Sequence, residues 1–129
     1  MRLALELLPD RLAMARLPPG AVSPYWARGA FFAVLGSATD LTVICDESAV
    51  PSQVESRDGF RCLRVRGQFE PASAGVVAAV ARPLADAGIS VFVQSTWETA
   101  FILVNEADLA TAQRVLLEAG HAVVDISEA

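Results

Sequence analysis

Residues 89–104 read ISVFVQSTWETAFILV, and this stretch decides the architecture of the second half of the chain. Two apolar runs flank the polar residues 94–99, a pattern typical of two strands that form a hairpin. A tight reversal needs only two residues, so this loop is longer than chain reversal requires. Three of its residues carry hydroxyl groups and one is Trp97. The loop is therefore a candidate binding element as well as a turn.

Helical patterns lie on both sides of this hairpin. The sequence AGVVAAVARPLADAG at 74–88 places four apolar side chains on one face at helical spacing: Val77, Val80, Leu84 and Ala87. Within this segment, Pro83 is expected to kink the helix or to break it near residue 82. The sequence NEADLATAQRVLLEAG at 105–120 predicts a second helix with Asn105 as its N-cap.

Strands are predicted before the first helix and after the second, at 60–67 and 121–127. The order of elements from residue 60 to residue 127 is therefore β-α-β-β-α-β. This order predicts an α+β fold of the ferredoxin-like type, in which two helices pack on one face of a four-stranded antiparallel sheet.

The first half of the chain is rich in strands and poor in helix. A strand at 3–9 is expected to end at Pro9, a single helical turn is expected at 23–29, and the runs 30–36 and 40–47 predict a second hairpin. The polar segment 48–60 is the best internal boundary. We therefore expect two parts, a strand-rich N-terminal half at 1–59 and a ferredoxin-like domain at 60–129.

Composition excludes several classes of function. The chain has 129 residues, is 53% hydrophobic and carries a net charge of −5. Such apolar content predicts a folded core, whereas the acidic balance argues against nucleic acid as a partner. No apolar run approaches the ~20 residues that a membrane span needs, so we expect a soluble, cytoplasmic protein without a membrane partner. The N-terminal residues are expected to form a strand and not a secretion signal, and buried free thiols are therefore expected for Cys45 and Cys62.

No cofactor or metal site is predicted. Cys/His clusters and phosphate-binding glycine motifs are absent from the sequence, and His121 is its only histidine. A nucleophile paired with a histidine base is not recognisable either, so we expect no enzymatic activity.

The second half of the chain resembles an ACT domain. The resemblance is carried by RVRG at the end of the first strand, by Gly75 at the start of the first helix, by PLADAGISVF, and by STWETAFILV. More narrowly, it is similar to small bacterial ACT proteins related to the amino-acid-sensing ACT repeats of eukaryotic arginine sensors and to aspartokinase regulatory domains. The N-terminal half looks like a degenerate first ACT repeat. The resemblance implies a non-catalytic, ligand-binding regulatory fold whose ligand lies between the start of the first helix and a neighbouring ACT unit.

Candidate ligand-binding residues follow from the chemistry of an amino acid. The N–H groups at the start of the first helix suit a carboxylate, and hydroxyl groups of the hairpin loop donate and accept hydrogen bonds, while an acid suits an ammonium group. The candidates are Glu70, Gly75, Val76, Ser95, Thr96, Glu98 and Thr99. Two plainer interpretations remain open. Gly75 could serve only close packing of helix and strand, and the loop hydroxyls could satisfy their own backbone while Trp97 caps the edge of the core.

One residue departs from the family pattern. The acid that follows the threonine in this family is replaced here by Ala100. The leading hypothesis is therefore a regulatory protein that senses an amino acid, forms a homodimer and acts on a partner enzyme. The alternative is a protein–protein interaction or oligomerisation module that has lost its ligand.

Overall fold

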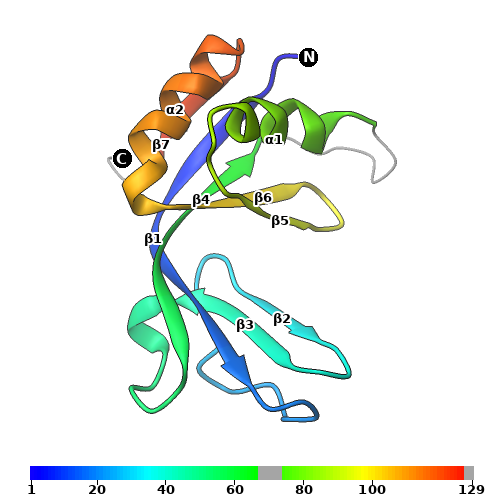
Figure 1. Cartoon of the computed structure of the whole chain (residues 1–129), viewed down its shortest axis with the longest axis vertical. Helices are drawn as coiled ribbons and strands as arrows, with labels where there is room; N and C mark the ends of the chain where they lie inside the picture. Colours follow the sequence, from blue (N-terminus) through cyan, green and yellow to red (C-terminus); the bar gives the residue numbers. More distant parts are fainter. Residues whose placement is uncertain (67–73, 127–129) are drawn as a thin grey trace. The chain divides into compact units, whose positions relative to one another are not determined.

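The structure is a computed structural model that describes residues 1–66 and 74–126 (Figure 1). The described residues form an α+β fold. Its strands are β1 (Ala4–Leu17), β2 (Ala33–Gly36), β3 (Leu41–Asp46), β4 (Ser56–Val65), β5 (Phe92–Ser95), β6 (Ala100–Asn105) and β7 (Ala122–Asp125). Its helices are α1 (Val76–Asp86) and α2 (Leu109–Glu118), with short 3-10 turns η1 (Glu47–Ala49) and η2 (Glu106–Asp108).

The chain divides into two compact units. Unit 1 contains Met1–Pro9 and Arg61–Ala129, and unit 2 contains Asp10–Phe60. The first nine residues thus belong to the same unit as the ferredoxin-like segment. Strands β1 and β4 contribute residues to both units. A division into evolutionary domains at 59/60 stays a prediction.

Unit 1 has the predicted β-α-β-β-α-β order of elements, from β4 through α1, β5, β6 and α2 to β7. The strand order in its sheet is β7-β1-β4-β6-β5. The sheet therefore has one strand more than the four predicted, because β1 lies between β4 and β7. Residues Ala4–Leu7 of β1 pair in parallel with Ala122–Asp125 of β7.

Both helices of unit 1 cover the same face of its sheet. Members of the core come from alternate positions of three strands and from one stripe of each helix, and they are Leu3, Leu5, Leu7, Leu63, Val65, Val76, Val80, Leu84, Ile89, Ala100, Ile102, Val104, Ala112 and Leu116. Side chains at alternate strand positions point to one face, so the helices share that face. This confirms the predicted layering of two helices on one side of a sheet.

The buried stripe of α1 differs from the predicted one by a single position at its start. Val76, Val80 and Leu84 are buried, whereas Val77 is 40% exposed. Ala87, the other end of the predicted face, lies after the helix and is exposed. The buried residues are spaced four positions apart. Because Val76 and Val77 are both apolar, helical spacing in the sequence did not distinguish which of them is buried.

Unit 2 contributes four strands and no α-helix. Its strands follow the order β2-β3-β1-β4, in which the first and last strands of the unit are adjacent at one side and the hairpin β2–β3 lies at the other. This is the ferredoxin-like order, so the unit supports a tandem ACT-like arrangement. All of residues 10–60 are described, and η1 is their only helical element.

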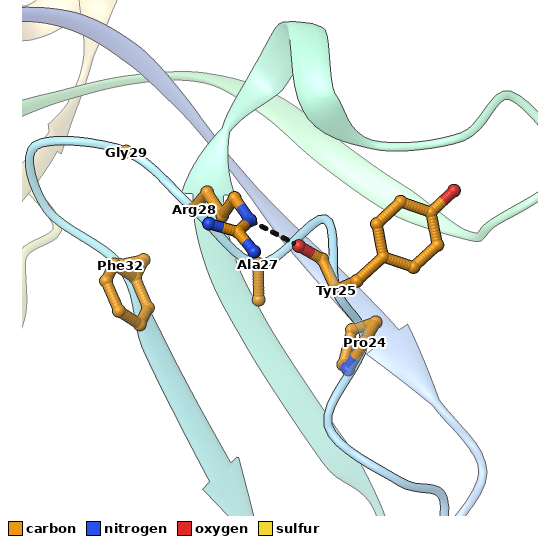
Figure 2. A pocket seen from close by; sticks show the side chains of 6 residues that line it. All are labelled: Pro24, Tyr25, Ala27, Arg28, Gly29 and Phe32. Atoms are coloured by element: carbon orange, nitrogen blue, oxygen red, sulfur yellow. Dashed lines mark hydrogen bonds between the residues drawn. The ribbon is translucent and has the colours of Figure 1, made fainter.

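The predicted helical turn at 23–29 is a hydrogen-bonded turn and not a helix. The Ala27 N–H donates to the Pro24 carbonyl at 3.2 Å, and no further helical bond follows. The Arg28 Nε donates to the Tyr25 carbonyl at 2.8 Å, which orders the side chain next to this turn (Figure 2). The predicted hairpin of 30–36 and 40–47 is confirmed as the antiparallel pair β2–β3.

Pro9 does not end the first strand. Strand β1 continues through Pro9 to Leu17. The segment 4–7 pairs with β7 and the segment 12–17 pairs with β3, so Pro9 lies between the two ladders. Proline lacks a backbone N–H. Pro9 is tolerated because neither the pairing with β7 nor the pairing with β3 needs an N–H at this position.

Pro83 does not break α1 either. The helix continues from Val76 to Asp86 with Pro83 inside it. A proline removes the N–H that would bond to the carbonyl four residues earlier, which is that of Ala79. The buried His121 replaces that donor, because its Nε2 lies 2.8 Å from the Ala79 carbonyl oxygen. Its Nδ1 accepts the Leu3 backbone N–H at 3.0 Å, which assigns the proton to Nε2.

Candidate functional site

Helix α1 begins at a residue without a side chain. Gly75 is its N-cap, with a left-handed backbone (φ 87°), and within residues 1–66 and 74–126 no side chain caps the helix start. The first turn contains no acidic residue, and its first intrahelical bond runs from the Ala79 N–H to the Gly75 carbonyl at 2.8 Å. The amides before Ala79 have no helical acceptor, so this end of the helix favours an anionic group. Glu70, a predicted ligand residue, lies outside the described residues.

Val76, the next predicted residue, is directed into the core of unit 1. Its exposed fraction is 7%, and it packs with Val65 and Ala100 in the same buried cluster. The side chain of Val76 therefore anchors the start of α1 to the core, and only the backbone N–H of Val76 is suited to contact a ligand.

The hairpin loop between β5 and β6 closes on itself. The Thr96 N–H donates to the Thr99 carbonyl at 2.8 Å, and the Thr99 N–H donates to Thr96 Oγ1 at 3.2 Å. The Thr96 hydroxyl in turn donates to the Thr99 carbonyl oxygen at 3.3 Å. Ser95 pairs with Ala100 as the last ladder pair, so the reversal takes four residues instead of six. These bonds hold the loop in one shape without a ligand.

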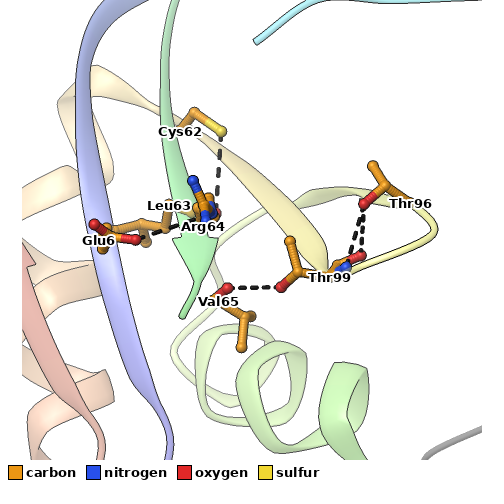
Figure 3. A network of polar contacts seen from close by, with 7 residues as sticks. All are labelled: Glu6, Cys62, Leu63, Arg64, Val65, Thr96 and Thr99. Atoms are coloured by element: carbon orange, nitrogen blue, oxygen red, sulfur yellow. Dashed lines mark hydrogen bonds and ion pairs between the residues drawn. The ribbon is translucent and has the colours of Figure 1, made fainter. Parts of the chain in front are cut away.

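Thr99 joins this loop to the end of β4. Its Oγ1 donates to the Val65 carbonyl at 2.6 Å, and Figure 3 shows the side chain extending across from the start of β6. Val65, Val76 and Ala100 belong to one core cluster. The structure therefore brings the hairpin, the end of β4 and the first residue of α1 to one end of unit 1.

The other predicted loop residues face outward. Ser95, Thr96 and Glu98 are exposed, and Trp97 is 86% exposed. Trp97 thus neither caps the core nor covers a described neighbour. Ala100, where the resemblance predicted an acid, is only 4% exposed and belongs to the core.

The arginines of β4 differ in environment. Arg61 is buried, with an exposed fraction of 9%. Its Nη2 donates to the Leu8 carbonyl at 3.1 Å, and its Nη1 lies 4.0 Å from Glu106 Oε1. Arg64 is more open and lies 3.9 Å from Glu6 Oε1 through its Nε (Figure 3). A buried guanidinium needs acceptors, and the Leu8 carbonyl provides one.

Both cysteines are free and buried, as predicted. Burial is the main cause that raises the pKa of the Cys45 thiol above its ordinary value of 9.0. A backbone hydrogen bond from Arg28 opposes this shift, while the negative charge of Asp46 adds to it. The thiol of Cys45 is therefore a packing group and a poor nucleophile at neutral pH.

This raised pKa predicts how stability depends on alkaline pH. Below about pH 9 the Cys45 thiol is protonated in both the folded and the unfolded chain. Above it the unfolded thiol loses its proton first, so the free energy of unfolding falls as pH rises through the folded pKa, by up to about 1.4 kcal/mol per pH unit. Urea unfolding between neutral pH and about pH 10 measures this slope.

Cys45→Ala is the control for that prediction. The chain contains no lysine, so few other groups titrate in the alkaline range. A slope that is equally steep in Cys45→Ala would contradict the assignment to this thiol.

The described residues contain no group of three or more His, Cys, Asp or Glu side chains that could hold a metal ion. Among the described helices, none is both long and apolar enough to cross a membrane. One further hollow, which the sequence did not predict, lies in unit 2 and is lined by Pro24, Tyr25, Ala27, Arg28, Gly29 and Phe32.

Comparison with known proteins agrees with this geometry. Residues 55–118 match the family model of the ACT domain. A solved protein from Agrobacterium tumefaciens is 30% identical, with a TM-score of 0.92, and the match covers 97% of this chain and 94% of that one. A protein of unknown function from Vibrio cholerae is 24% identical, with a TM-score of 0.75 and coverage of 92% and 90%.

The fold also occurs in a regulatory subunit. The ligand-free regulatory subunit of aspartate kinase from Thermus thermophilus is 11% identical, with a TM-score of 0.65 and coverage of 89% and 96%, so it shares the fold alone. No curated protein matches the sequence. From the family match over 55–118, the 30% identical relative and the tandem sheet order, the chain belongs to the ACT-domain proteins.

Proposed function

We propose that this chain is a non-catalytic regulatory protein that binds an amino acid or a similar small metabolite. ACT domains are regulatory modules that bind small molecules, and this chain has the ACT fold. The proposed ligand residues are Glu70, Gly75, Val76, Ser95, Thr96, Glu98 and Thr99.

One observation carries the proposal. Helix α1 starts at Gly75 with neither a side-chain cap nor an acid in its first turn, at the same end of unit 1 as the Thr99–Val65 hydrogen bond. Such a helix start suits a carboxylate, because its first N–H groups have no acceptor within the helix and carry partial positive charge. The exposed hydroxyl of Ser95 and the exposed carboxylate of Glu98 supply partners for an ammonium group.

The binding energy would be used to regulate a second protein. A ligand shifts an equilibrium only through unequal affinity for two states, such as two arrangements of a dimer. We propose a homodimer in the cytoplasm that passes this shift to a partner enzyme. The absence of an acid at Ala100 predicts modest affinity, since the ammonium group then depends on Glu98 or Glu70.

A thermal-shift screen against the twenty amino acids tests the proposal. Binding to the folded state raises Tm in proportion to the logarithm of ligand concentration, so one or two amino acids are expected to give a dose-dependent rise at millimolar concentration. Ser95→Ala and Thr96→Ala are expected to reduce that rise, because each removes a hydroxyl from the loop.

Two further variants separate binding from loop damage. Thr96→Ser keeps the hydroxyl that closes the loop and should retain the response. Ser90→Ala removes an exposed hydroxyl that lies outside the loop and should leave the response unchanged. If no amino acid raises Tm in the unaltered chain, ligand sensing is wrong for this protein.

A second candidate function rests on Trp97. A tryptophan that is 86% exposed on a loop already closed by its own hydrogen bonds is a candidate anchor for another protein. Together with the missing acid at Ala100, it favours an interaction or oligomerisation module that binds no ligand. Trp97→Ala should then change the oligomeric state measured by light scattering, and under the ligand-binding proposal it should not.

A further inference from the structure

The hollow in unit 2 has the chemistry of a binding site for a small carboxylic acid. It has a volume of about 430 Å³ and opens to solvent. Its lining residues come from the loop between β1 and β2, which holds Pro24, Tyr25, Ala27, Arg28, Gly29 and Phe32. None of the residues proposed above to bind an amino acid belongs to it, so the two sites are tested separately.

Arg28 is held in place by two hydrogen bonds to the backbone of its own unit. Its Nε donates to the Tyr25 carbonyl at 2.8 Å, and its carbonyl accepts the Asp46 N–H at 3.3 Å. The next residue, Gly29, has a φ of 145°, and a Cβ there would lie 3.2 Å from the Phe31 carbonyl oxygen. This loop conformation therefore depends on glycine, and it fixes the backbone from which the Arg28 side chain extends.

The bond made by Nε leaves both Nη groups of Arg28 available. No described carboxylate forms an ion pair with Arg28, unlike Arg82 and Arg114, each of which pairs with an acid four residues later. The two Nη groups of a guanidinium donate in parallel to the two oxygens of one carboxylate. Because the bond from Nε already restricts the Arg28 side chain, less conformational entropy of this side chain is lost when a carboxylate binds.

Two aromatic residues, Tyr25 and Phe32, belong to the lining of the hollow. In Figure 2 the Arg28 head group lies between Phe32 and the backbone of Tyr25, next to Ala27, and the Tyr25 ring points away from it. Tyr25 is 83% exposed and Phe32 is 54% exposed, although Ala27 between them is buried. Exposed rings stabilise no core, whereas a flat apolar ligand that covers them removes their surface from water.

The charge of the hollow limits the ligand to a single negative charge. Arg28 is the only charged residue among the six that line it. One guanidinium balances one carboxylate, while a phosphate or a polyanion would lack a second cation.

From these contacts we propose that the hollow formed by the loop that connects β1 to β2 binds a monocarboxylic acid with a flat apolar body, with Arg28 holding the carboxylate and Phe32 contacting the body. Because the hollow is open, the affinity is weak and lies in the millimolar range.

The test is an NMR titration of the full-length, ¹⁵N-labelled chain with phenylacetate. Saturable amide shifts are expected at residues 25–32. Acetate lacks the ring and phenylacetamide lacks the charge, so both should bind more weakly. Arg28→Gln is expected to weaken phenylacetate binding at least about tenfold, and Arg28→Lys to weaken it less, since lysine keeps the charge but loses the paired donors.

Arg57→Gln is the matched control. Arg57 is exposed, lies in the same unit and carries the same charge, but it does not line the hollow. It should bind phenylacetate like the unaltered chain. Equal affinity in Arg28→Gln, equal affinity for phenylacetamide, or shifts confined to residues 75–76 and 95–99 would each overturn the proposal. In the amino-acid screen Ser95→Ala and Thr96→Ala locate the response in the hairpin loop, whereas Arg28→Gln locates phenylacetate binding in the hollow, so failure of that screen and failure of this proposal are distinguishable.

Discussion

Replacing His121 with alanine is expected to lower the free energy of unfolding by about 3 to 5 kcal/mol, because one buried and one partly buried backbone group lose the imidazole as their hydrogen-bond partner. The Nε2 of His121 lies 2.8 Å from the Ala79 carbonyl oxygen, and its Nδ1 accepts the Leu3 N–H at 3.0 Å. The residue itself is 4% exposed, so water does not easily replace either bond. Urea unfolding followed by circular dichroism measures the loss.

A double-mutant cycle with Pro83 tests the reason for that loss. Pro83→Ala returns a backbone N–H to the helix, and this N–H can donate to Ala79 in place of His121. His121→Ala should therefore destabilise the Pro83→Ala background by less, with a coupling of about 1 to 2 kcal/mol. If the two changes were additive, the imidazole would not be substituting for the missing helix donor.

Ala100→Asp is expected to lower the free energy of unfolding by about 3 kcal/mol or more at neutral pH, because it places a carboxylate among apolar side chains. Ala100 is 4% exposed and shares its cluster with Val65 and Val76. Burial should raise the pKa of the new carboxyl group, so the loss should shrink as pH falls and the group becomes neutral. Unfolding curves at neutral and acidic pH measure both effects.

The matched variant is Ala100→Asn, which has nearly the same shape without the charge. It should be less destabilising at neutral pH and should show no comparable recovery in acid. An Ala100→Asp variant that keeps its stability and responds to an amino acid would contradict burial of the charge. It would instead indicate that this position opens onto the ligand and that the family's acid binds the ammonium group there.

Much of the fold could be predicted because the signals are local. Alternation of apolar residues marks the β5–β6 hairpin, and helical spacing marks α1 and α2. The two prolines that were expected to end or interrupt an element do not do so, and the reasons lie in the tertiary structure. Pro9 is tolerated because β1 changes partners around it, and Pro83 because His121, 38 positions later in the sequence, supplies a donor to Ala79.

The candidate site was predictable only in part, for the same reason. Hydroxyl groups at Thr96 and Thr99 were visible in the sequence, but their partners were not. Thr96 bonds within its own loop, whereas Thr99 reaches Val65, which precedes it by 34 positions. The Arg28 hollow could not be predicted, because exposed aromatic residues in a loop carry no periodic signal and their neighbours are set by the fold of unit 2.

Local chemistry along the chain thus determines the type and order of its elements, since hydrophobic period, turn residues and helix ends act over a few residues. Tertiary structure decides which strands become neighbours, including the insertion of β1 between β4 and β7. It also decides which polar groups are satisfied, as at His121 and Thr99. Strand pairing and buried hydrogen bonds join residues far apart in sequence, and their free energy depends on burial that exists only after the chain has folded.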